Sequence, residues 1–240
     1  MGKEHNSKTT TYILLLMLFV VVAAGFAFNK FRYENRPGAE TREGFSNTPY
    51  LYSFYVSSNP DITEIPYYGD EEASITITAF LDIESVASKY FIEEIFPRLE
   101  NDYIDRGEVK FYQKNYITLE DIESKNNNFK YSLALKCINK IKEQSYYPIY
   151  FDLFSTGIGK IDILLKKHKI PVNLYNKCLE NFEVDDLYKD ALEIENLGVV
   201  GVNQRFYIRI AGRDNTVLDG VPRYTRFQKV IRLLEVKIGI

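Results

Sequence analysis

The spacing of apolar residues predicts alternating strands and helices in the first half of the globular region. Apolar and polar residues alternate over 74–80, the period-two pattern of a half-buried strand. Residues 85–103 instead repeat apolar side chains near every 3.6 positions, which predicts a helix that Pro97 should kink or divide. Alternation returns over 108–116 and predicts a second strand. This order predicts parallel pairing through a right-handed crossover.

Helical spacing dominates the middle of the chain. It predicts helices within residues 119–144, 147–154, 161–168, 172–179 and 187–197. Strand patterns then return at 205–210 and 216–218 across a turn at 212–215, and an amphipathic helix follows at 223–236. An aromatic stretch at 51–56 predicts one extra strand. The order predicts an α/β fold with one sheet, helices on both sides and a helical insertion over about 117–197.

The amino-terminal segment predicts a membrane anchor. Residues 12–28 contain no charged or strongly polar side chain, and with the three preceding threonines the run has 20 residues. At about 1.5 Å per residue this helix reaches about 30 Å, the thickness of a bilayer core. A buried core helix is disfavoured because the run has no polar face, whereas a cleaved signal peptide stays an alternative. We therefore divide the chain into a tail (1–11), a transmembrane helix (12–28), a polar linker (29–49) and a globular domain (50–240).

Charge and composition narrow the function classes. Residues 1–32 have four basic residues and one acidic residue, a net charge of +3, so the rest of the chain carries −6. That acidic balance disfavours nucleic-acid binding, and the 45% hydrophobic content excludes a largely disordered chain. Basic residues flank the predicted span on both sides, so the positive-inside rule does not orient it. A short tail before a single span favours an extracytoplasmic domain. Two cysteines are too few for a zinc site of four thiolates, and we expect neither a metal nor a cofactor.

Three segments carry a family resemblance. They read TAFLDIESVASKYF at 78–91, YSLALKCINKIKEQSYYPIYFDLF at 131–154 and LGVVGVNQRFYI at 197–208. In this order they resemble the DsbA-like branch of the thioredoxin superfamily, and the match covers about residues 70–238. The resemblance implies a thioredoxin-like fold with an inserted helical domain.

The resemblance also implies a degenerate active site. The family places a Cys-x-x-Cys motif at a helix amino terminus, where the helix dipole stabilises a thiolate. Here the motif reads Ser85-Val86-Ala87-Ser88, and a serine hydroxyl has no reversible two-electron couple. Ser85 is expected to serve as a helix N-cap. A serine nucleophile would need a base, and His5 and His168 are poorly placed in the sequence to supply one.

Two further positions depart from the family pattern. Ala79 stands where relatives often carry a buried acid, and Asn203 stands at the position of the family's cis-proline. A non-proline cis bond costs about 2.5–4 kcal/mol, so we expect the bond from Val202 to Asn203 to be trans. Asp82 and Glu84 match acidic positions of the family and are interpreted as solvated charges at a helix start.

The two cysteines lie outside the motif. Cys137 and Cys178 match positions where some relatives carry a second, structural disulfide, and the alternative is two unpaired buried thiols. Their separation of 41 residues is unlike Cys-x-x-Cys, which disfavours redox catalysis by this pair. A disulfide here would favour an extracytoplasmic domain.

These observations support three functions of different classes. The first is a membrane-anchored, redox-inactive DsbA-like domain that acts as a binding module, scaffold or subunit of an envelope complex, with another envelope or membrane protein as partner. Its expected contact groove comprises Ser85, Val86, Ser88, Val202 and Asn203. The alternatives are a thiol-disulfide oxidoreductase that uses Cys137 or Cys178, and a peptide-binding chaperone. The basic cluster Lys166, Lys167, His168 and Lys169 is interpreted as a solvated helix end.

Overall fold

A computed structural model describes residues 59–199, 201, 204–210, 216–220 and 222–238. The predicted tail, anchor and linker, the strand at 51–56, the turn at 212–215, Val202 and Asn203 lie outside these residues. Within the described part of the chain, no helix has the length and apolar character needed to cross a bilayer.

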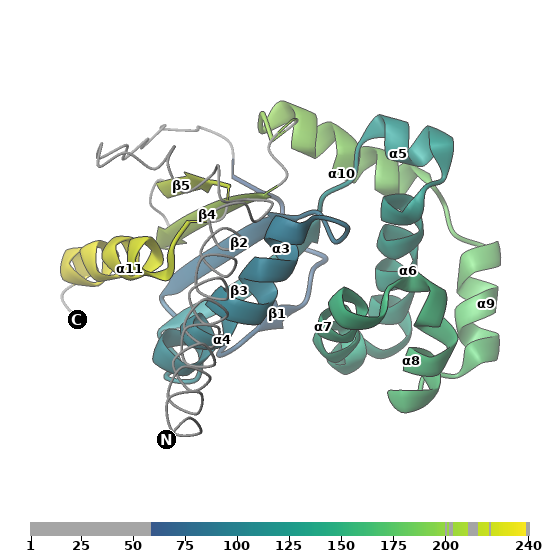
Figure 1. Ribbon diagram of the computed structural model, residues 1–240, viewed down its shortest axis with the longest axis horizontal. Coiled ribbons are helices and arrows are strands. Elements are labelled where there is room, and N and C mark those ends of the chain that lie inside the picture. Colours follow the sequence, from purple (N-terminus) through teal and green to yellow (C-terminus); the bar gives the residue numbers. More distant parts are fainter. Residues whose placement is uncertain (1–58, 200, 202–203, 211–215, 221, 239–240) are drawn as a thin grey trace, which may run out of the picture. The chain divides into compact units, whose positions relative to one another are not determined.

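A five-stranded sheet forms the centre of the domain (Figure 1). Its strands are β1 (Tyr67–Tyr68), β2 (Ile75–Leu81), β3 (Val109–Asn115), β4 (Gln204–Ile210) and β5 (Thr216–Asp219), in the spatial order β1-β3-β2-β4-β5. β2 and β3 pair in parallel, as the β-α-β order predicts, and the other neighbours are antiparallel. The two-residue strand β1 was not predicted, because two tyrosines are too short to show a period.

The helix that crosses from β2 to β3 runs without a break past Pro97 but changes between α- and π-helical geometry. It consists of α3 (Val86–Tyr90), a π-helical stretch (Phe91–Ile95), α4 (Phe96–Leu99) and a second π-helical stretch (Glu100–Ile104). Pro97 lies in the first turn of α4. Proline has no backbone N–H and its ring crowds the preceding turn, so the wider π turn before it accommodates the residue without ending the helix.

The insertion contains six α-helices within the described residues. They are α5 (Leu119–Ser124), α6 (Asn127–Lys142), α7 (Tyr146–Thr156), α8 (Ile161–Lys167), α9 (Val172–Glu180) and α10 (Asp185–Asn196). The helical pattern over 119–144 therefore forms two α-helices and a short 3₁₀ turn. Lys125 adopts a left-handed conformation (φ 51°) that ends α5, and the Asn126 side chain accepts from the Phe129 N–H to start α6.

Helices cover both faces of the sheet, as predicted. On one face, Phe91 of the crossover helix, Phe206 of β4 and Phe227 of α11 (Tyr224–Ile238) pack together, with ring centroids 4.7–5.9 Å apart. On the other face, Phe80 and Tyr207 belong to a second core cluster with Leu187, Ala191 and Ile194 of α10. All seven residues of β2 are buried, as expected for a central strand covered on both sides.

The segment before β1 binds to both the sheet and the insertion. The backbone N–H of Asp61 donates to Glu193 of α10 (2.7 Å), and its carbonyl accepts from Lys114 of β3 (2.7 Å). The hydroxyl of Tyr147 donates to the Pro66 carbonyl (2.9 Å). The chain is therefore fixed to the domain from about residue 61 onward.

Candidate functional site

The site predicted from the serine motif lies where β2 ends and α3 begins. The Asp82 carbonyl accepts from the Ser85 N–H (3.0 Å), and the Asp82 carboxylate accepts from the Glu84 N–H (2.9 Å). This tight turn aims the Ser85 side chain at the first turn of α3, where its Oγ accepts from the Ala87 N–H (3.2 Å). Ser85 is thus the helix N-cap, as predicted.

One glutamine side chain joins both serines of the motif. Nε2 of Gln204 donates to Oγ of Ser85 (2.7 Å) and to Oγ of Ser88 (3.0 Å). Gln204 begins β4 and pairs with Leu81, the last residue of β2, so the sheet places its amide beside the start of α3. Ser88 is 0% exposed and Gln204 is 4% exposed. We call this trio of Ser85, Ser88 and Gln204 the glutamine clamp.

The hydrogen bonds of the clamp disfavour a role of either serine as a nucleophile. Both hydroxyl oxygens accept hydrogen bonds from an amide, which is neutral and does not remove a proton. A nucleophilic serine needs a base within hydrogen-bond reach. His168 lies at the end of α8 in the insertion, where its Nε2 is 2.7 Å from the Asp152 carboxylate. His5 lies outside the described residues.

The two acidic residues before the motif differ in environment. Glu84 is exposed and accepts from the Asn127 amide (3.0 Å), which agrees with a solvated charge. Asp82 is half-buried, and this burial raises the pKa of its carboxyl group, with a smaller contribution from the charges of Asp121 and Glu84. The interpretation of Asp82 as a solvated charge is therefore wrong, because the start of the insertion covers it.

The exposed surface next to the clamp includes two large side chains on α3. Val86 is 80% exposed and Tyr90 is 53% exposed, and the two lie one turn apart on α3. The structure therefore brings three of the five predicted groove residues, Ser85, Val86 and Ser88, to one helix start, but Ser88 is fully buried and does not reach the surface. The other two, Val202 and Asn203, lie outside the described residues.

Ala79, at the position of the family's buried acid, is 0% exposed. Its partners in the sheet are Gln113 on β3 and Phe206 on β4. Gln113 is also 0% exposed, and its Oε1 accepts from the Tyr146 hydroxyl (2.7 Å). The polar groups of this part of the core are therefore neutral amide and phenol groups.

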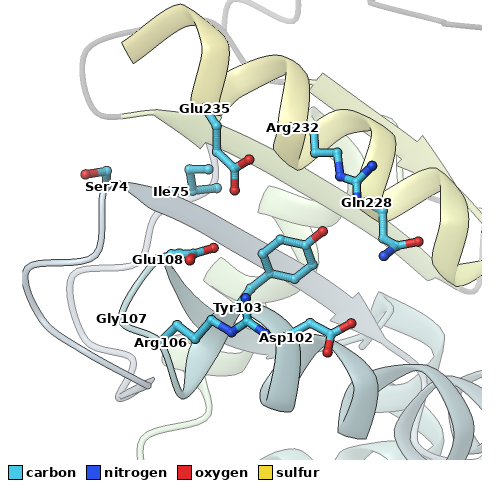
Figure 2. Close-up of a pocket in the computed structure, with 10 residues that line it drawn as sticks. All are labelled: Ser74, Ile75, Asp102, Tyr103, Arg106, Gly107, Glu108, Gln228, Arg232 and Glu235. Atoms are coloured by element: carbon cyan, nitrogen blue, oxygen red, sulfur yellow. The ribbon is translucent and has the colours of Figure 1, made fainter. Parts of the chain in front are cut away.

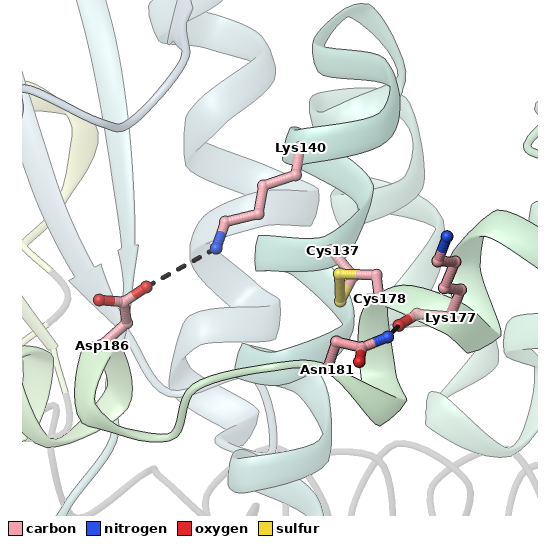
Figure 3. Close-up of a disulfide and its surroundings, with 6 residues drawn as sticks. All are labelled: Cys137, Lys140, Lys177, Cys178, Asn181 and Asp186. Atoms are coloured by element: carbon pink, nitrogen blue, oxygen red, sulfur yellow. Dashed lines mark hydrogen bonds and ion pairs between the residues drawn. A yellow bond between two sulfur atoms is a disulfide. The ribbon is translucent and has the colours of Figure 1, made fainter.

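The two cysteines form a disulfide between α6 and α9 (Figure 3). The S–S distance of Cys137 and Cys178 is 2.04 Å, their Cα atoms are 5.8 Å apart, and Cys137 is fully buried. The predicted disulfide is present, and it lies within the helical insertion. Neither cysteine is therefore a free thiol.

A hollow of about 460 Å³ lies at the opposite end of β2 from the clamp (Figure 2). Its walls are the carboxyl end of the crossover helix, the start of β2 and one side of α11, with Glu108 and Glu235 facing each other. Burial raises the pKa of Glu235, and the neighbouring Glu108 carboxylate adds to the shift. The hollow contains none of the predicted site residues, and the described residues form no cluster of metal ligands.

Sequence reasoning missed Gln204. Its position directly after Asn203, in the segment matched to the family, was the available clue. Its hydrogen bonds, however, join residues 119 and 116 positions apart in the chain. They therefore depend on the pairing of β4 with β2.

Comparison with known proteins agrees with this fold. The thioredoxin family model matches residues 62–195, more than half of the chain. Disulfide bond formation protein D of Bacillus subtilis is 39% identical over 56 residues, which is 23% of this chain and 25% of that protein. The matched segment thus spans a quarter of the relative's length.

Solved structures share the fold over most of the domain. BdbD from Bacillus subtilis in its oxidised form superposes with a TM-score of 0.62 at 22% identity, covering 73% of this chain and 95% of that one. α-DsbA1 from Wolbachia pipientis gives a TM-score of 0.62 at 16% identity, covering 74% and 94%. DsbA from Chlamydia trachomatis gives 0.58 at 17% identity, covering 75% and 96%. The chain therefore belongs to the thioredoxin family, and its fold is that of the DsbA-like branch.

Proposed function

We propose that this protein is a redox-inactive DsbA-like domain that binds another envelope or membrane protein, as a binding module, a scaffold or a subunit of a complex. The observation that carries the proposal is the glutamine clamp. Ser85 and Ser88 stand where the family resemblance places the two cysteines, and a single amide from β4 engages both of their side-chain oxygens. A serine hydroxyl can neither form a disulfide nor exchange with one.

The proposal places the domain outside the cytoplasm on a membrane anchor. The disulfide of Cys137 and Cys178 supports this location, because structural disulfides persist in oxidising compartments. The apolar run at 12–28 supports the anchor, since its length suits a bilayer core. An alkaline extraction of native membranes tests the anchor, and release of the intact chain into the soluble fraction would contradict it.

The proposed contact surface is the exposed start of α3. Val86 and Tyr90 present apolar area directly beside the clamp, and the clamp fixes the helix that carries them. Tyrosine is enriched in protein interfaces, because its ring buries a large area while its hydroxyl can still reach a partner. A photo-crosslinking residue in place of Tyr90 should therefore capture one protein in native membranes. The same residue in place of Tyr188, 40% exposed on α10, is the matched control.

A thiol-disulfide oxidoreductase is the second candidate. The names of the relatives favour it, since one is a disulfide bond formation protein and another similar structure is a thiol-disulfide exchange protein from Wolbachia pipientis. In this chain such an activity would have to use Cys137 and Cys178, which already form the disulfide between α6 and α9.

An insulin-reduction and thiol-oxidation assay on the purified full chain separates the two candidates. We expect no turnover above background from the natural protein. The variant Ser85→Cys with Ser88→Cys serves as a control that contains the family motif. Turnover by the natural protein that disappears in Cys137→Ala with Cys178→Ala would establish the oxidoreductase and refute our proposal.

A further inference from the structure

The outer face of α11 combines positive charge with exposed apolar side chains. Residues 223–237 contain five basic residues and one acidic residue, a net charge of +4, whereas residues 33–240 as a whole carry −6. Four of the basic residues recur every third position: Arg223, Arg226, Lys229 and Arg232. This helix is thus a basic element on an otherwise acidic domain.

The apolar residues lie among these charges. Leu233 is 47% exposed and Val236 is 77% exposed. Together with Lys229 and Arg232 they line a shallow hollow of about 330 Å³ on α11. The inner face of the helix is buried in the core through Phe227, Val230, Ile231 and Leu234. The inner side of the helix is therefore apolar, and its outer side carries both apolar and basic side chains.

We call Lys229, Arg232, Leu233 and Val236 the α11 strip. The acidic residue of α11, Glu235, faces Glu108 across the hollow between α11 and the crossover helix (Figure 2), and it is half-buried there. Arg232 lines that hollow too, and its charge partly offsets the burial that raises the pKa of Glu235, so it lies at the border of the two hollows. The other three residues of the strip do not line the hollow that holds Glu235.

We propose that the α11 strip docks on the anionic phospholipid surface of the membrane to which the chain is anchored. Basic side chains beside exposed apolar ones suit a bilayer interface, where phosphate groups lie next to the first acyl carbons. This inference rests on the proposed anchor at residues 12–28, since the anchor keeps the domain beside a bilayer.

Because the proposed anchor tethers the chain to the bilayer, even a weak affinity for the membrane surface is sufficient for docking. Thirty residues, 29–58, separate the predicted span from the described domain. However they fold, they cannot exceed about 3.5 Å per residue, or about 105 Å. A domain confined within that radius of the bilayer has an effective concentration on the order of 1 mM. Each basic residue near an anionic surface strengthens binding about fivefold, so Lys229 and Arg232 together contribute about 25-fold.

Nitroxide labels on the full chain test the docking. Val236→Cys is labelled on the strip, and Val86→Cys, of matched exposure (80% against 77%), is the control on α3. The natural cysteines are bonded to each other and do not react with the label. Each protein is reconstituted in phosphatidylcholine vesicles and in vesicles with one third phosphatidylglycerol. Flotation reports membrane association. The ratio of the nitroxide's accessibility to oxygen and to a water-soluble nickel chelate reports how deeply the label is immersed in the bilayer.

We expect the Val236 label to become immersed in the anionic vesicles and to stay aqueous in the neutral ones, while the Val86 label stays aqueous in both. The changes Lys229→Gln and Arg232→Gln should together reduce docking about 25-fold.

A chain that floats with both vesicle types while its Val236 label stays aqueous refutes the docking and retains the anchor. A chain that floats only with anionic vesicles refutes the anchor and retains the docking. Failure to float with either refutes both. If polyglutamate immobilises the Val236 label and vesicles do not, the strip binds an acidic protein and our proposal is wrong.

Discussion

The glutamine clamp should contribute measurably to stability, and the change Gln204→Leu tests it. Leucine has a volume similar to that of glutamine, so the substitution removes the amide without opening a large cavity. It deletes the bonds from Nε2 to Ser85 and Ser88. Ser85 keeps its bond from the Ala87 N–H, whereas the structure shows no other hydrogen bond from a described residue to Oγ of the buried Ser88.

The expected loss follows from these two environments. A buried hydroxyl left without its partner costs about 1–3 kcal/mol, and a partly exposed hydrogen bond contributes about 0.5–1 kcal/mol. We therefore expect Gln204→Leu to lower the free energy of unfolding by about 2 kcal/mol. For a domain of this size, that corresponds to a fall in Tm of about 4–8 °C.

Urea unfolding of the purified protein measures this loss, and a double-mutant cycle identifies its source. Ser88→Ala combined with Gln204→Leu removes both partners, so the double variant should recover about 1 kcal/mol relative to the sum of the single changes. Gln228→Leu on α11 is the matched control and should change stability by less than about 0.5 kcal/mol. A Gln204→Leu loss equal to that of the control, or coupling near zero, would show that the clamp does not hold α3 on the sheet.

Two further changes test the rest of the site. Cys137→Ala with Cys178→Ala should lower the free energy of unfolding by about 4 kcal/mol, because the bond closes a loop of 41 residues. Reductant should destabilise the natural protein similarly in urea unfolding, and a loss below about 1 kcal/mol would contradict the estimate. Burial raises the pKa of Asp82 in the folded state, so its ionised form destabilises the fold at neutral pH. Asp82→Asn, which can still accept from the Glu84 N–H, should therefore be more stable than the natural protein at pH 7. The difference in stability between the two proteins should shrink as the pH falls through the folded pKa and vanish below about pH 4. Equal stability of the two proteins at pH 7 would refute this prediction.

Local patterns predicted the parts of this fold that depend on neighbours in the chain. The period-two alternation before Asp82 predicted β2, and a serine before an apolar helical repeat predicted the N-cap Ser85. Pro97 predicted an irregularity in the crossover helix, and the helix changes from π to α geometry directly before it, because the restriction acts on its own backbone.

The errors arose where distant segments meet. Asp82 is half-buried because the start of the insertion, with Asn128, packs against it, and Gln204 reaches the serines only after β4 pairs with β2. The strand β1 forms through the pairing of Tyr67 with Tyr112, and no pattern in the sequence around Tyr67 indicates this contact. Such features are set by tertiary packing and are not visible in a window of a dozen residues.

The core behind the clamp also supports the proposal that this protein is redox-inactive. Thiol-disulfide exchange needs a thiolate, so a buried thiol must pass its proton to an acceptor as it attacks. In this chain the position that relatives often fill with an acid holds Ala79, and its strand partner is the neutral amide of Gln113. Gln113 accepts from Tyr146, and burial raises the pKa of that phenol well above its ordinary value, so it stays protonated at neutral pH. These three positions therefore hold no carboxylate. The α3 start is fixed by the Gln204 amide and by the half-buried Asp82, which accepts from the Glu84 N–H (2.9 Å), and this arrangement suits the fixed binding surface that we propose.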